Sequence, residues 1–154
     1  MHVEIIPFQS KYATIFRDLN VAWLEKYFVV EPHDKEVLSR CEETIINPGG
    51  YIYFAKVDNT IVGCFALMKM SDGVFELTKM AVSPAYQGKK IGQELLKFTI
   101  ETAKKEKFKQ LLLYSNRKLE NAIYLYRKYG FEEVTLEKNN PYQRADIKMV
   151  YKGI

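Results

Sequence analysis

The chain has 154 residues, which is enough for one domain with its own core and no need of metals or disulfides. Its composition, 47% hydrophobic and 27% charged, is ordinary for a globular protein and excludes a disordered or fibrous chain. No apolar run approaches the ~20 residues of a membrane span, and a net charge of +4 is too small to indicate nucleic acid as a partner.

The only cysteines are Cys41 and Cys64, and neither belongs to a CxxC spacing or lies beside clustered histidines. We therefore expect no metal site and two reduced, mostly buried thiols. The segment from Met1 to Glu4 carries an early acid and no apolar signal core, so the sequence predicts a cytoplasmic protein without a membrane partner.

The first third of the chain predicts one strand and two helices. Residues 3–7 read as a short strand, and Ser10 is predicted to cap the first helix. A second helix is predicted to start at Asp34 and to stop before the turn Asn47-Pro48-Gly49-Gly50. The first helix is indicated by apolar positions spaced near 3.6 residues: Tyr12, Ile15, Phe16, Leu19, Trp23 and Leu24.

Three strand-like runs follow, over residues 51–57, 61–70 and 74–82. The short turns Asp58-Asn59-Thr60 and Ser71-Asp72-Gly73 separate them, which predicts an antiparallel meander.

The second half alternates helices and strands. We expect a strand–helix–strand unit over residues 74–115, with its two strands parallel and the helix across one face. A ligand site is then expected at the carboxyl ends of those strands, beside the helix N-terminus. The predicted elements after the meander are a helix over 88–107, a strand over 110–115, a helix that carries Ala122, Leu125, Tyr126 and Tyr129 and ends at Gly130, and strands over 131–137 and 147–151.

The most informative segment is residues 80–96, in which a strand ends and a helix opens with Gly88 and Gly92. Free N–H groups and the dipole at such a helix start favour an anion, and Lys89 and Lys90 add positive charge. A pyrophosphate meets these conditions, although a Gly-containing helix start is more often only a turn. The spacing is neither that of a P-loop nor the GxGxxG dinucleotide fingerprint.

This segment resembles the pyrophosphate loop of the GNAT superfamily of acetyl-CoA-dependent N-acetyltransferases, which Gln87, Ile91 and Gly92 match. Lys90 replaces the usual middle glycine. Downstream, residues 121–131 (Asn-Ala-Ile-Tyr-Leu-Tyr-Arg-Lys-Tyr-Gly-Phe) are similar to a second stretch of the same family.

The resemblance implies one α/β (α+β) domain over residues 1–154, with a mixed, mostly antiparallel sheet splayed in its strand–helix–strand unit to admit coenzyme A. Acetyl-CoA is then the expected co-substrate, without a metal. The backbone of Met80, Ala81 and Val82 is expected to bind the pantetheine arm, as is one of the two asparagines Asn116 and Asn121. The residues implied for the pyrophosphate are Gln87, Gly88, Lys89, Lys90, Ile91, Gly92 and Gln93.

The resemblance also implies the chemistry. Tyr126 is the expected general acid for the leaving thiolate, against the alternative of a core tyrosine. Glu76 is the candidate base that deprotonates the amine, against the alternative of an exposed strand position or of a water relay. The N–H near Val82 is expected to polarise the thioester carbonyl.

The sequence does not identify the acceptor of the acetyl group beyond a small-molecule or peptide amine. A homodimer is compatible with the sequence. Tyr142 and Arg144 are candidates to line the acceptor pocket, with a surface salt bridge as the competing role for Arg144. Two further hypotheses stay open: a non-catalytic domain that binds acyl-CoA, for which Lys90 is the reason, and an interaction domain whose glycine turns are only structural.

Overall fold

The computed structural model describes residues 1–154 and contains one seven-stranded sheet, in the order β1-β2-β3-β4-β5-β7-β6. Every neighbouring pair is antiparallel except β4 and β5, which are parallel. The mixed sheet and its parallel pair were therefore predicted correctly. The strands are β1 (Glu4–Pro7), β2 (Tyr51–Val57), β3 (Thr60–Ser71), β4 (Val74–Val82), β5 (Gln110–Ser115), β6 (Phe131–Val134) and β7 (Ile147–Tyr151).

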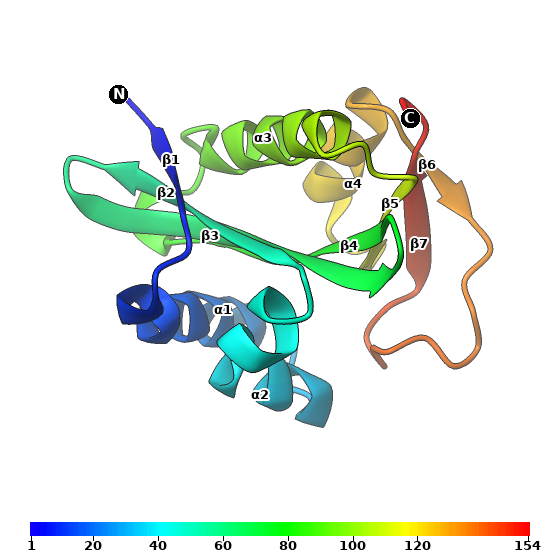
Figure 1. Ribbon diagram of the computed structural model, residues 1–154, viewed down its shortest axis with the longest axis horizontal. Coiled ribbons are helices and arrows are strands. Elements are labelled where there is room, and N and C mark those ends of the chain that lie inside the picture. Colours follow the sequence, from blue (N-terminus) through cyan, green and yellow to red (C-terminus); the bar gives the residue numbers. More distant parts are fainter.

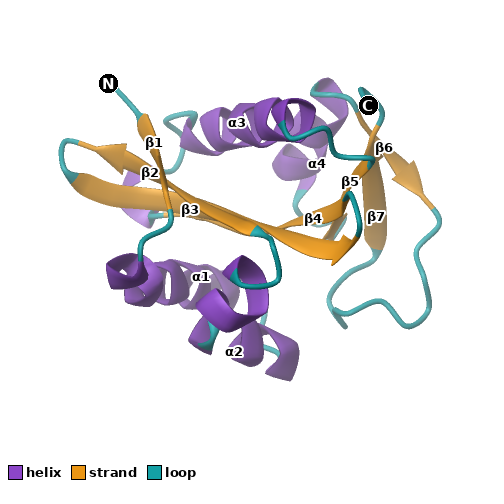
Figure 2. Cartoon of the chain, viewed as in Figure 1, coloured by secondary structure: helices purple, strands orange, loops and turns teal.

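Helices cover both faces of the sheet (Figure 1). On one face lie α1 (Ala13–Tyr27) and α2 (Pro32–Ser39), and on the other lie α3 (Ile91–Lys105) and α4 (Glu120–Lys128). Figure 2 shows the resulting three layers, with the sheet between the two pairs of helices. None of these helices combines the length and the apolar character that crossing a membrane requires.

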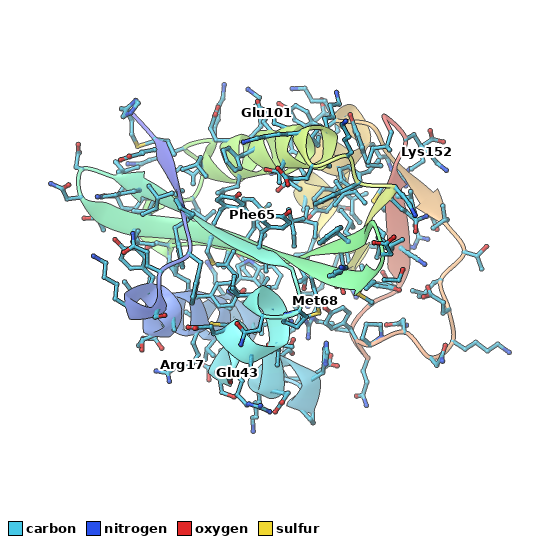
Figure 3. The ribbon with its side chains drawn as sticks, in the orientation of Figure 1. Arg17, Glu43, Phe65, Met68, Glu101 and Lys152 are labelled. Carbon is cyan, nitrogen blue, oxygen red and sulfur yellow. The ribbon has the colours of Figure 1, made fainter.

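Each face of the sheet has its own core. Phe65 of β3 belongs to the cluster beneath α3, and Met68 packs on the cluster beneath α1 and α2. Figure 3 shows these two side chains on opposite sides of the sheet, as expected for positions an odd number of residues apart. The largest fully buried side chains include Phe16, Phe54 and Phe131.

The strand bounds agree well with the sequence, but some helix ends differ. Ser10 does not cap α1, because its hydroxyl donates to Glu42 Oε1 at 2.8 Å and a short 3-10 turn precedes the helix. The second helix starts at Pro32 and not at Asp34, because the Glu31 and Asp34 side chains form a reciprocal capping box.

Two later ends differ as well. α3 begins at Ile91 and not at residue 88, since the preceding residues form the turn that leads into it. β6 stops at Val134 and not at residue 137. Glu137 instead binds the hydroxyl of Tyr114 at 2.7 Å, at the start of a loop that returns to β7.

Candidate active site

A cleft opens where β4 and β5 separate. The two strands pair only from Val74 to Leu77 and from Gln110 to Leu113, so the remainder of each strand diverges from the other. The cleft has a volume of about 810 Å³, and residues 78–82 of β4 and Tyr114 and Ser115 of β5 face each other across it. The splay that the sequence predicted between these strands is therefore present.

A β-bulge in β4 shapes one wall of this cleft. Lys79 and Met80 both lie opposite Phe65 of β3, and Lys79 adopts a left-handed φ of 55°. The Lys79 side chain turns away from solvent and lies 2.7 Å from Asp34 Oδ1 in α2, with 3% of its side chain exposed. A left-handed φ is unfavourable for a lysine, and the buried pairing of the Lys79 ammonium with Asp34 stabilises this conformation.

The backbone of β4 beyond the bulge presents a donor to the cleft. Ser83 N–H donates to Val62 O of β3 at 2.8 Å. Successive backbone groups of a strand point to opposite neighbours, so the Val82 N–H points away from β3, towards the opening between β4 and β5. Met80, Ala81 and Val82 all line the cleft.

The turn before α3 provides free backbone donors at one end of the cleft. Glu94 N–H makes the first helical bond, to Lys90 O at 3.1 Å, and no N–H from residue 88 to residue 93 has a backbone acceptor. Gly88 has a φ of 78°, and a Cβ added at Gly92 would meet nothing within 4 Å. The Gln87 amide donates to Val82 O at 3.3 Å, which ties the turn to β4.

Lys90 has a φ of 64° and a ψ of 18°, which is the left-handed conformation that favours glycine. The turn therefore follows a glycine path although a lysine replaces the middle glycine of the resembled motif. Lys90 lines the cleft, whereas Lys89 does not, and the Lys89 ammonium lies over the Tyr86 ring at 5.3 Å. Ile91 is 1% exposed and anchors the helix start in the core.

Tyr126 of α4 lies at the cleft, with its ring 5.8 Å from that of Phe131. Its hydroxyl bonds to no protein group. Since no buried side-chain nitrogen or oxygen lacks a partner, this hydroxyl is open to the cleft. Burial raises the pKa of Tyr126 to about 12, so the phenol keeps its proton at neutral pH. Such a group can donate to an anion that forms in the cleft.

Glu76 is 1% exposed, so the alternative of an exposed strand position is wrong. Its Oε2 accepts the hydroxyl of Tyr142 at 2.6 Å, and the Tyr142 hydroxyl lies 3.0 Å from Thr78 Oγ1. Tyr142 and Thr78 line the cleft and Glu76 does not. Burial raises the pKa of Glu76, and the Tyr142 hydrogen bond offsets part of that rise.

Arg144 lines the cleft, but its role as a surface salt bridge is wrong. The guanidinium binds Asp34 Oδ2 at 2.7 Å and Glu31 Oε2 at 3.2 Å, with 18% of the side chain exposed. Burial disfavours ionisation of Asp34, but its hydrogen bonds to Arg144 and the charge of Lys79 hold the pKa of this carboxyl far below its usual range. These four residues, Glu31, Asp34, Lys79 and Arg144, are called the ion-pair network below.

The two candidate asparagines both line the cleft but differ in their partners. The Asn116 amide donates to Arg144 O at 2.8 Å, and its carbonyl oxygen accepts Lys118 N–H at 2.9 Å. Asn121 lies in the first turn of α4 and is exposed. The Asn121 side chain makes no hydrogen bond within the protein and the Asn116 amide keeps a second N–H, so both asparagines can engage a ligand in the cleft.

Sequence reasoning missed Lys79, Asp34 and an aromatic wall at the end of α1. Trp23, Tyr27 and Phe28 line the cleft, with the Trp23 ring 5.7 Å from that of Phe28. The spacing of Trp23 indicated only a helix face, and no local signal indicates a bulge at a lysine. Pro32 was the available sign that the second helix starts before Asp34. No group of three or more His, Cys, Asp or Glu side chains is arranged to hold a metal ion.

Comparison with known proteins identifies the architecture. The family model described as "Acetyltransferase (GNAT) domain" matches residues 48–133. An IAA acetyltransferase of Azospirillum brasilense is 32% identical over 92 residues, which are 59% of this chain and 60% of that protein. The chain spans 35% to 64% of the length of the curated relatives it matches.

Solved structures agree in fold. A GNAT-family acetyltransferase of Staphylococcus aureus Mu50 superposes with a TM-score of 0.85 at 24% identity, over 97% of this chain and 98% of that one. The PaiA N-acetyltransferase of Thermoplasma acidophilum, solved in complex with coenzyme A, gives 0.76 at 20% identity over 98% and 99%. With a family model that covers more than half of its residues, the chain belongs to the GNAT acetyltransferase family.

Proposed function

We propose that this protein is an acetyl-CoA-dependent N-acetyltransferase in which a primary amine attacks the thioester directly. The observation that carries the proposal is one continuous cleft, with unpaired N–H groups before α3 at one end and the free hydroxyl of Tyr126 beside it. These donors suit a ligand that carries phosphates and also generates a thiolate.

The coenzyme's pyrophosphate fits the turn from Gly88 to Gln93. The N–H groups of this turn have no backbone acceptor, so they are free to bind an anion. The helix dipole also favours negative charge at this position. Lys90 adds a cation that lines the cleft. The space beside Gly92 allows the phosphates to approach the backbone closely. The complex of PaiA with coenzyme A supports this assignment.

Bound acetyl-CoA would supply the thioester, and the chain's own groups would act around it. The Val82 N–H, which points into the cleft, is placed to stabilise charge on the carbonyl oxygen. Tyr126 is placed to donate a proton or a hydrogen bond to the departing sulfur. The protonated phenol is the form that this step requires.

The acceptor is a small-molecule or peptide amine that enters beside Tyr142, Arg144 and the aromatic wall. An amine that arrives as an ammonium must lose a proton before it attacks. Glu76 is a buried carboxylate that connects to this part of the cleft through the Tyr142 hydroxyl. The left-handed conformation of Lys90 leaves the glycine path of the turn intact, which supports binding of the coenzyme.

An amine-panel assay tests the proposal. Purified protein is mixed with acetyl-CoA and each of a set of amino acids, polyamines, aromatic amines and peptide N-termini, and free thiol is followed over time. We expect amine-dependent thiol release for at least one class, with the acetylated amine as product by mass spectrometry. Tight binding of coenzyme A by calorimetry without release for any amine would instead establish a binding domain.

A further inference from the structure

The candidate base Glu76 does not reach the cleft, yet two hydroxyl groups connect it to the cleft. Glu76 is 1% exposed and is absent from the cleft wall, whereas Thr78 and Tyr142 are both part of that wall. The three side chains are joined by hydrogen bonds of 3.0 Å, between Thr78 Oγ1 and Tyr142 Oη, and 2.6 Å, between Tyr142 Oη and Glu76 Oε2. They are called the hydroxyl chain below.

The hydroxyl chain has a direction. Each hydroxyl has one proton to donate, and the ionised carboxylate can only accept hydrogen bonds. Tyr142 donates its proton to Glu76, at a length typical of an O–H bonded to an ionised carboxylate. The 3.0 Å contact then has to be donated by Thr78 to the Tyr142 oxygen. A lone pair of Thr78 Oγ1 therefore stays available, and Thr78 is a partly exposed residue of the cleft wall, whereas Tyr142 is only 4% exposed.

On the basis of the proposed acetyltransferase function, we propose that Thr78 and Tyr142 conduct the proton of the acceptor ammonium from the cleft to Glu76. In this step the N–H bond of the ammonium breaks and an O–H bond forms on Thr78. The former Thr78 proton passes to Tyr142, and the former Tyr142 proton passes to Glu76 Oε2. The products are a neutral amine, two hydroxyls with exchanged protons and a neutral carboxylic acid, so charge and atoms balance.

The surroundings of Glu76 suit a carboxylate that accepts a proton and later returns it. Burial raises its pKa and so strengthens it as a base. The nearby cations Lys79 and Arg144 favour the ionised form of Glu76, but both are paired with other carboxylates, and burial outweighs them in setting its pKa. The remaining titratable neighbours of the chain are rings packed against Tyr142: His33 at 5.5 Å and Tyr114 at 5.8 Å.

A water relay in place of the two side chains is the competing route, and substitutions separate the two. Thr78→Val keeps the shape of the side chain and removes its hydroxyl, whereas Thr78→Ser keeps the hydroxyl. Tyr142→Phe removes the middle member. The matched control is Thr102→Val, since the Thr102 hydroxyl bonds only Phe98 O within α3, away from the cleft.

The decisive measurement is kcat/KM against pH for an amine that the wild type acetylates. Without the hydroxyl chain, only the fraction of amine that is already neutral in solution reacts. We expect Thr78→Val and Tyr142→Phe to lose about 10²-fold near pH 7, the lower end of a general-base contribution, and to recover tenfold per pH unit towards the pKa of the amine. Thr78→Ser, which restores the hydroxyl, should recover the shape of the wild-type pH profile relative to Thr78→Val, and Thr102→Val, away from the cleft, should leave kcat/KM unchanged.

A second measurement does not depend on turnover. The pKa of Glu76, followed by the carboxyl signal of labelled protein, should rise in Tyr142→Phe because the ionised form loses its hydrogen-bond donor. Profiles of Thr78→Val and Tyr142→Phe that run parallel to the wild type would overturn the chain, as would an unchanged Glu76 pKa. Lack of thiol release from the wild type with every amine would instead refute the proposed function, while the Glu76 titration still reports whether the chain exists.

Discussion

Lys90 offers a test in which stability and coenzyme affinity move in opposite directions. Its φ of 64° costs an L-residue roughly 1–2 kcal/mol, which glycine does not incur. Glycine also makes the unfolded chain more flexible, at a cost of roughly 0.5–1 kcal/mol. We therefore expect Lys90→Gly to stabilise the fold by about 0.5–1 kcal/mol, which raises the melting temperature by about 1–4 °C for a chain of this size.

The same substitution removes an exposed cation from the coenzyme end of the cleft. Interactions between exposed charges contribute about 0.2–1 kcal/mol, so the affinity for coenzyme A should fall by about 1.5- to 5-fold at low salt. The loss should shrink as salt is added, because screening already weakens this charge in the wild type. Calorimetric titration at two ionic strengths measures the affinity, and thermal unfolding without ligand measures the stability.

Two matched variants separate the two effects. Lys90→Ala removes the charge and keeps the left-handed strain, so it should lose affinity without the gain in stability. Lys89→Gly changes a neighbouring lysine whose φ is not positive and which does not line the cleft, so it should bring neither the stabilisation nor the loss of affinity. A Lys90→Gly protein that melts at or below the wild-type temperature would refute the assignment of strain, and an unaltered affinity at low salt would refute the role of the charge.

Three further outcomes follow from the site. Gly92→Asp should fold normally, because a Cβ there meets nothing within 4 Å, but calorimetry should detect no coenzyme A binding since a carboxylate occupies the phosphate space. Tyr126→Phe should lower turnover at least tenfold with nearly unchanged Michaelis constants, because the lost proton donor acts as the C–S bond breaks; wild-type turnover where chemistry limits the rate would contradict this. Asp34→Asn should lower the free energy of unfolding by about 3–5 kcal/mol at pH 7, while the exposed Glu36→Gln should change it little. The pKa of Asp34 is lower in the folded state than in the unfolded state, so its contribution to the free energy of unfolding is present above the unfolded value of about 3.9 and is lost as pH falls below it. In urea unfolding, the free energy of unfolding should therefore fall less on acidification in Asp34→Asn than in the wild type.

The sequence predicted the strands well because local signals set their ends. The turns at residues 58–60 and 71–73 combine short polar residues with glycine or left-handed positions, and β2 and β4 have the predicted bounds. Helix starts were harder to predict. Glu31 is an unusual cap, and its capping role depends on Asp34, which also serves a distant ion pair.

The candidate phosphate-binding turn could be proposed from the sequence because its residues are contiguous, from Gln87 to Gln93. The acceptor end could not, because tertiary contacts bring together residues far apart in the chain. Thr78 and Tyr142 are 64 positions apart, and Glu31 and Arg144 are 113 apart. No periodicity links such positions, and the bulge at Lys79 depends on a partner that the local pattern does not indicate.

The bulge also bears on where this domain could be divided. The segment matched by the family model, residues 48–133, contains Lys79 but leaves out Asp34 on one side and Arg144 on the other. A fragment with those limits would keep the turn before α3 but lack α1 and α2, so Lys79 would lose both its carboxylate partner and the helices that cover it. The bulge would then lack the ion pair that holds it, and the cleft wall would lose its shape. The smallest unit that keeps the ion-pair network therefore extends from Glu31 to Arg144, beyond both ends of the segment that the family model matches.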